Sequence, residues 1–534
     1  MPGDEDERLA VFERLSVLTG VPVTNTSQQQ SLYEQADPVL IETYSNLAQL
    51  YNAPIQDTLD VSGLVPQLQP SILDVYRTYS FAQYLPAPVA SGVSITVAQI
   101  IEQESVFLPG VRVIPEPIRR YPTGELTAHI VGFMGPLPSE AWLDLGYQRN
   151  DRVGLSGLEV SMEPLLAGKK GERQIIQDWS GREVGQVGVS LPPTAGYNLH
   201  LTLDIDLQIK AQEILSRTME EIRNYAIVDF FTGRSEYREI ELATVVAMNP
   251  QTGEVLAMVN IPSFDNNLFA TEIPVEYYLG LLRNDYEPFL NHAIAGQYPP
   301  APHKVVTVAA ALQEGIVAPT RLLEAPERFW WRTSLPPNDP GRAQEFVCWI
   351  SLPPNFSSHG LVNAYIGLAQ SCDIYMYKIA GGYAPENIRG MGMDTLQIYS
   401  NQFGMGRLQG IELPLEAPGN IPNRQWKQLN FGEPWSTGDD YNAAIGQGYI
   451  TATPMQVAQM AAVIANGGFL YRPTVIHHLT DENGEVFVLN ENLEPVPAAS
   501  RGVPIDEEGN VGFVPQVVDV LEVDRQFIDV VAEG

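Results

Sequence analysis

One stretch, QYPPAPHKVVTVAAALQEG at residues 297–315, limits most strongly what this chain can fold into. Three prolines stiffen an extended approach, and the apolar run that follows, residues 305–312, stops before Gly315, which suits the end of a helix. A helix this rich in alanine and valine is expected to be buried, because it has little polar surface to offer water. Lys304 stands at its first turn, so the sequence predicts a charged side chain held in the middle of a domain.

The length and the composition indicate a globular protein of two or three domains. A chain of 534 residues is too long for one ordinary core, and 44% hydrophobic with 18% charged residues is usual for globular chains. The 64 acidic residues outnumber the 31 basic ones, which gives a net charge of −33. Because this charge repels nucleic-acid phosphates and anionic lipids, we expect no nucleic acid and no membrane surface as partners.

Cysteine and histidine give no sign of a metal site or a cofactor. Cys348 and Cys372 have no metal-ligand spacing and form no disulfide framework; they could pair if the fold brings them together, but two ordinary thiols are expected. The seven histidines show no His-Glu-x-x-His pattern. His477 and His478 are adjacent, and neighbours on a strand point to opposite faces. No run of about 18 apolar residues occurs, and residues 1–20 lack a signal-peptide core. The sequence predicts no metal, no cofactor and no membrane segment in this chain.

Alternation and turn chemistry predict several elements in the second half of the chain. Residues 199–215 alternate like a strand and then change to helical spacing. Residues 243–267 read as two apolar strands around a Pro-Gln-Thr-Gly turn, which predicts a β-hairpin. Residues 359–382 predict a helix, a short break and a second helix. Residues 224–240 contain glycine and several charges and are expected to be a loop insertion.

Two further predictions concern helix positions. Residues 4–18 and 31–50 are amphipathic segments separated by proline-containing breaks. Thr453, which precedes Pro454, is predicted to cap a helix whose apolar face packs in the core.

Several long segments resemble the class B penicillin-binding proteins. LPGVRVIPEPIRRYPTGELTAHIVGFMG (108–135) and GLSGLEVSMEPLLAGKKGER (154–173) are similar to segments of that family's N-terminal, non-catalytic domain. FGMGRLQGIELPLEAPGNIP (403–422) and the segment at 439–473, which contains AIGQGYITATPMQ, are similar to its transpeptidase domain. The resemblance implies an α+β fold with an N-terminal dimerisation or pedestal domain over residues 1–197. It also implies a transpeptidase domain over residues 198–534, with a central antiparallel sheet flanked by helices.

The stretch at 297–315 is similar to the family's SxxK motif, which commonly reads YPPGSTFK. In that motif the serine is the nucleophile, and the lysine three residues later on the same helix face accepts its proton. Here the lysine is Lys304, but the residue three before it is Ala301, and the segment is one residue shorter. A methyl group cannot attack a carbonyl, and the next hydroxyl, Thr307, lies too far into the helix to replace it.

Two other motifs place further candidate site residues. Ser371-Cys372-Asp373 is similar to the family's SxN motif, which implies a proton relay for Ser371 and a substrate contact for Asp373. We predict an ion pair between Lys304 and Asp373. Gly446, Gln447 and Gly448 are expected to form a tight turn and to contribute to substrate binding.

The family's third motif, Lys-Thr-Gly, does not occur in the 534 residues. In the family this motif lies on a strand that lines the cleft and supplies a backbone N–H to the oxyanion hole. The sequence therefore predicts a chain that stops before this motif and a sheet that is incomplete on its C-terminal side.

The resemblance leaves two functions open. The first is a peptidoglycan D,D-transpeptidase of class B and PBP2-like type, acylated by D-Ala-D-Ala stem peptides or by a β-lactam but impaired in this chain. The second is a pseudoenzyme that serves as a scaffold, or an incomplete gene product, in the cell-wall synthesis machinery. Both functions imply a location outside the cytoplasm, in the cell envelope, and a glycosyltransferase as a partner. The family's usual membrane anchor is missing from this sequence.

Overall fold

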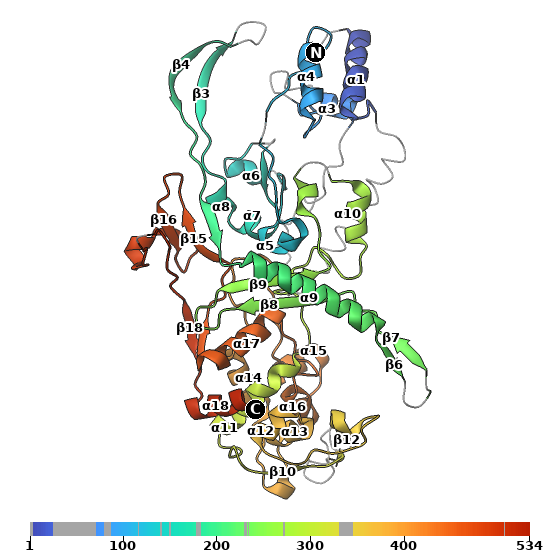
Figure 1. Ribbon diagram of the computed structural model, residues 1–534, viewed down its shortest axis with the longest axis vertical. Coiled ribbons are helices and arrows are strands. Elements are labelled where there is room, and N and C mark those ends of the chain that lie inside the picture. Colours follow the sequence, from blue (N-terminus) through green and yellow to red (C-terminus); the bar gives the residue numbers. More distant parts are fainter. Residues whose placement is uncertain are drawn as a thin grey trace. The chain divides into compact units, whose positions relative to one another are not determined.

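The computed structural model describes residues 4–24, 71–79, 87–115, 117–138, 141–148, 151–177, 183–228, 232, 234–270, 273–330, 345–506 and 508–534. The chain forms two compact units, drawn in Figure 1. The first contains residues 1–167 and 262–289, and the second contains residues 168–261 and 290–534. The predicted amphipathic segment at 31–50 lies outside the described residues. Among the helices of these ranges, none is both long and apolar enough to span a bilayer.

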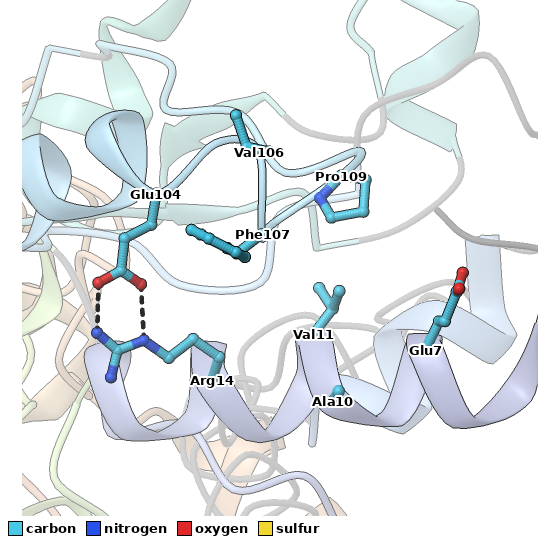
Figure 2. A pocket seen from close by; sticks show the side chains of 8 residues that line it. All are labelled: Glu7, Ala10, Val11, Arg14, Glu104, Val106, Phe107 and Pro109. Carbon is cyan, nitrogen blue, oxygen red and sulfur yellow. Dashed lines mark hydrogen bonds and ion pairs between the residues drawn. The ribbon is translucent and has the colours of Figure 1, made fainter.

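The N-terminal part of the first unit is a small helical cluster. Helix α1 (Glu5–Thr19), with Asp4 as its N-cap, covers the segment at 4–18 that was predicted to be amphipathic. It buries Val11 and Leu15, but Leu9 and Val17 are exposed, so the separation of apolar and polar faces is weak. It packs on α3 (Ile72–Tyr79) and α4 (Ile95–Gln103) through buried apolar side chains such as Phe12 and Ile101. Figure 2 shows Arg14 of α1 facing Glu104, with two hydrogen bonds of 2.7 and 2.6 Å. They border a cavity of about 700 Å³ that is also lined by exposed Val106 and Phe107.

The rest of the first unit is built from short elements around aromatic side chains. Phe264 lies within 6 Å of three other phenylalanine rings, and Arg119 pairs with buried Glu159 at 2.7 Å. Strands β1 and β2 pair antiparallel. The remaining elements are η2 (Gly124–Leu126), α5 (Ala128–Val131), β1 (Met134–Pro136), α6 (Ala141–Asp144), β2 (Arg152–Gly154), α7 (Gly157–Ser161), α8 (Glu163–Leu166), η3 (Asn266–Phe269) and α10 (Val275–Leu282).

The second unit opens with strands and one long helix, as predicted. Strand β5 (Asn198–Leu201) leads into α9 (Ile205–Asn224), and β8 (Ala243–Met248) pairs with β9 (Val255–Ile261) as the predicted hairpin. Helix α9 packs on both strands of this hairpin, and α17 (Pro454–Asn466) packs on β8. Within the described residues no third strand joins β8 and β9.

The prediction of a loop insertion at 224–240 was wrong in one respect. Strand β6 (Ala226–Val228) pairs antiparallel with β7 (Ser235–Tyr237), so the insertion is a second hairpin. Three-residue strands are too short for alternation to identify them. A longer antiparallel pair, β3 (Glu172–Gln177) with β4 (Glu183–Leu191), precedes β5.

The largest sheet has the order β17-β16-β15-β5. Its strands are antiparallel: β15 (Ile476–Thr480), β16 (Val486–Leu489) and β17 (Pro495–Pro497) beside β5. The expectation that His477 and His478 point apart was wrong, because their Nδ1 atoms lie 2.8 Å from each other. The register shifts between Ile476 and His478, and such a bulge breaks the alternation of side chains.

Helices form the core that surrounds the predicted buried helix, α11 (Lys304–Gln313). Its residues from Val306 to Leu312 are all buried. It packs on α13 (Asp373–Gly381), α14 (Gly392–Gln402), α12 (Ala364–Ala369) and α18 (Arg525–Glu533). The other elements are β10 (Leu323–Ala325), β11 (Arg328–Trp330), β12 (Glu345–Val347), η5 (Trp349–Ser351), β13 (Gly360–Val362), η6 (Ala384–Glu386), α15 (Arg424–Phe431), α16 (Thr437–Ala444), α17 (Pro454–Asn466), β14 (Phe469–Tyr471), η7 (Ala498–Arg501) and β18 (Val517–Val520).

The predicted cap of α17 is present. The Thr453 side chain accepts a hydrogen bond from the Gln456 backbone N–H, while the Gln456 side chain accepts one from the Thr453 N–H. This reciprocal pair fixes the start of a helix that packs on β8.

Candidate active site

A turn of 3₁₀ helix, η4 (Ala301–His303), leads directly into α11. Ala301 and Pro302 are exposed, whereas His303 is completely buried. Nε2 of His303 lies 2.9 Å from Ser400 Oγ, and burial lowers the pKa of this imidazole to about 4. His303 is therefore a neutral, packed side chain that anchors the turn, and Ala301 lies on the outer side of the same turn.

Lys304 meets both members of the second motif. Its Nζ lies 2.9 Å from Ser371 Oγ and 2.9 Å from Asp373 Oδ1, so the predicted ion pair is present. The lysine and aspartate side chains are only 12% and 13% exposed. The structure thus brings together three residues that are up to 69 positions apart in the sequence.

The break between α12 and α13 gives Ser371 its position. Ser371 has a φ of 51°, which few residues other than glycine adopt, and α13 begins two residues later at Asp373. A carboxylate in the first turn of a helix is favoured by the positive end of the helix dipole. Strain at Ser371 and the helix start together direct the two side chains toward Lys304.

This group combines an amine, a hydroxyl and a carboxylate within hydrogen-bonding distance. A lysine beside a serine hydroxyl can relay protons in acyl transfer. At the position three before Lys304, however, the side chain is the methyl group of Ala301. Thr307 is buried and donates a hydrogen bond of 2.8 Å to the Ala444 carbonyl, so its hydroxyl is engaged in packing.

The turn at Gly446, Gln447 and Gly448 lies against the approach to Ala301. Gly446 has a φ of 70°, and a Cβ there would overlap the Pro300 carbonyl oxygen and lie 2.9 Å from His303 Cβ. Gln447 and Gly448 are exposed. Gly446 therefore allows close packing of two backbone segments, while Gln447 and Gly448 are accessible to solvent.

A group that the sequence did not suggest lies beside the second motif. Cys348, His359 and Cys372 each offer a metal-ligand atom, and these three atoms lie within 4.8 Å of one another. Cys348 Sγ is 3.5 Å from His359 Nδ1 and accepts the backbone N–H of Asp373 at 3.3 Å. A hydrogen bond from the Cys372 thiol lowers the pKa of Cys348, while the same hydrogen bond together with burial raises the pKa of Cys372.

These ligands fit a borderline-soft divalent cation such as Zn²⁺. Two thiolates and an imidazole are three of the ligands of common zinc sites, and the second ring nitrogen of His359 is buried without a partner among the described residues. The spacings 348, 359 and 372 match no short motif, so only the fold reveals the cluster. Metal bound here would adjoin the backbone of Asp373.

We expect the purified protein to retain about one Zn²⁺ per chain, measured by elemental mass spectrometry after desalting. His359→Ala should lower this content strongly, because it removes one of the three ligands. His200→Ala is the matched control, because His200 is an exposed histidine stacked on His478 in another sheet. Equal zinc content in the two variants would argue against the assignment.

Comparison with known proteins identifies two domains in this chain, and the site described above lies in the second of them. Residues 15–201 match the penicillin-binding protein dimerisation domain, and residues 243–509 match the penicillin-binding protein transpeptidase domain. The chain therefore belongs to the class B penicillin-binding proteins, which join these two domains. Several of the solved structures it resembles are PBP2 proteins.

Three relatives illustrate the similarity. The peptidoglycan D,D-transpeptidase MrdA of Acinetobacter baumannii is 30% identical over 442 residues, which are 82% of this chain and 56% of the relative. The chain thus spans little more than half the length of that protein. PBP2 of Pseudomonas aeruginosa in complex with WCK 5153 is 26% identical, with a TM-score of 0.55 over 78% of this chain and 74% of that one. A chain of a peptidoglycan synthase complex that coordinates polymerization and crosslinking is 25% identical, with a TM-score of 0.62 over 86% and 70%.

Proposed function

We propose that this chain acts in peptidoglycan cross-linking at the cell envelope, and that its transpeptidase cleft recognises D-Ala-D-Ala stem peptides or β-lactams without becoming acylated on its own. The observation that carries the proposal is Ala301, which stands at the nucleophile position of a site that otherwise keeps Lys304 and Ser371 at 2.9 Å. Lys304 would serve as the base, Ser371 as the proton relay and Asp373 as a substrate contact. Gly446, Gln447 and Gly448 would border the bound peptide.

We propose a scaffold role as the second function of this chain. A cleft that binds without reacting can hold a substrate or a partner in place. Similarity to a chain of a peptidoglycan synthase complex supports a glycan-polymerising partner. We assign the docking and pedestal role to residues 1–197 and the cleft to residues 198–534, and the matches to the dimerisation and transpeptidase domains support this division.

We expect the unmodified chain to show no covalent label with a fluorescent penicillin. Removing the nucleophile of a catalytic triad lowers the rate by about 10⁶-fold, and a methyl group offers no oxygen to acylate. The test is intact-mass spectrometry after incubation, together with a denaturing gel. A mass increase equal to the β-lactam, retained on denaturation, would refute the proposal.

Ala301→Ser supplies the missing hydroxyl and is the matched gain-of-function variant. Label on this variant, and none on Ala301→Ser combined with Lys304→Met, would show that Lys304 activates position 301. Label on both variants would mean that position 301 is acylated without Lys304 or that another group is acylated, and peptide mapping of the label distinguishes the two.

A further inference from the structure

A cavity of about 270 Å³ adjoins the turn at 446–448 in the second unit. Asp439, Asn442 and Ala443 on one face of α16 line one side of it, because residues three and four apart share a helix face. Trp435 and Tyr449 supply aromatic walls, and Gln447 lies at the turn. A space of this size is smaller than a typical drug-sized pocket and suits a single residue of a polymer.

Contacts with neighbouring side chains fix the two aromatic side chains. Trp435 Nε1 donates a hydrogen bond of 2.9 Å to Asp440 Oδ1. The Tyr449 ring packs against Phe431 and Trp426, with ring centroids 4.9 and 5.4 Å away. Fixed aromatic surfaces of this kind bind a flat apolar face without a large loss of side-chain entropy.

The cavity carries no unbalanced charge. Asp439 Oδ2 accepts hydrogen bonds of 2.7 Å from Lys427 Nζ and of 2.7 Å from the Ser436 backbone N–H. The neutral polar side chains among the lining residues include the carboxamides of Asn442 and Gln447 and the hydroxyl of Tyr449, each of which can donate and accept. Neutral polar groups beside aromatic walls select an uncharged ligand that has hydroxyl or amide groups and an apolar face.

A backbone contact links this cavity to the candidate active site. Gly446 packs on the Pro300 carbonyl, directly before Ala301, and the same turn carries Gln447 and Gly448. We propose that this cavity binds one N-acetylated sugar of the peptidoglycan glycan strand. The inference rests on the proposed function, because the bound sugar would hold its attached stem peptide near Ala301 and Lys304.

Calorimetry with the full chain and the soluble trimer of N-acetylglucosamine tests this inference. We expect binding with a dissociation constant of about 1 mM, and a loss of about tenfold or more in affinity for Asn442→Ala combined with Gln447→Ala. Gln425→Ala, an exposed glutamine on α15 outside the cavity, should bind as the unmodified chain does. Circular dichroism of each variant shows whether the fold is kept.

Equal affinity in all three proteins, or no heat with the unmodified chain at about 10 mM sugar, would overturn the inference. Binding of a D-Ala-D-Ala stem peptide that depends on Gln447, with no sugar binding, would overturn it too, because the cavity would then be a peptide site. Sugar binding is measured without acylation. If the penicillin-labelling prediction fails, the sugar-binding result can therefore still be interpreted. If sugar binding fails, the penicillin-labelling result can still be interpreted.

Discussion

Gly446→Ala is expected to destabilise the second unit by about 3–5 kcal/mol, which would be one of the largest effects of a single methyl group in this chain. The added Cβ would overlap the Pro300 carbonyl oxygen and lie 2.7 Å from its carbonyl carbon. Both partners are backbone atoms, so neither can rotate away. The φ of 70° adds strain for any L side chain. Urea denaturation followed by tryptophan fluorescence measures the loss.

Gly448→Ala is the matched control. Its φ is 71°, but a Cβ there meets only the Asn442 side chain, at 3.1 Å and at an exposed position. We expect a cost of about 1 kcal/mol from backbone strain alone. Equal losses at the two glycines would mean that the contact with Pro300 contributes nothing.

The same clash has a chemical consequence. To relieve it, the 446–448 turn must move away from Pro300, and Pro300 directly precedes Ala301. A Gly446→Ala chain that still folds should therefore lose any penicillin label gained by Ala301→Ser. The turn is thus expected to position residue 301 as well as to stabilise the fold.

Elements with strong local signals were predicted from the sequence. The apolar run of α11, the turn between β8 and β9 and the Thr453-Pro454 cap each combine several residues that favour one structure. Lys304, Ser371 and Asp373 could be placed together because the order of family motifs supplied the long-range contact that periodicity cannot. Local sequence patterns thus predicted these elements, and the order of the motifs predicted that the three side chains lie together.

The failures lie where a contact depends on the fold or on one backbone irregularity. Cys348 reaches Cys372 only because β12 and the start of α13 lie side by side, and no local spacing signals this. His477 and His478 meet through a register shift that strict alternation excludes. The hairpin of β6 and β7 is too short to show a period. These features arise only from the three-dimensional fold.

The pair of Lys304 and Asp373 should behave as one unit in a double-mutant cycle. Lys304→Met leaves Asp373 as a charge that is only 13% exposed, and Asp373→Asn leaves Lys304 in the same position. Removing one partner of a buried ion pair typically costs about 3–5 kcal/mol, because the remaining charge is desolvated and unpaired. Removing both charges avoids that penalty. We therefore expect the double variant to be more stable than either single variant.

The free energy of unfolding of the four proteins gives the coupling energy directly. Lys210 and Glu213 on α9 are the control pair, with the same charges at 2.9 Å but 63% and 59% exposed side chains, and their coupling should be about 0–1 kcal/mol. Additive losses at Lys304 and Asp373 would contradict a buried pair. Strong coupling would instead mean that the Asp373 carboxylate stabilises the charged Lys304 amine, which lies 2.9 Å from Ser371 Oγ.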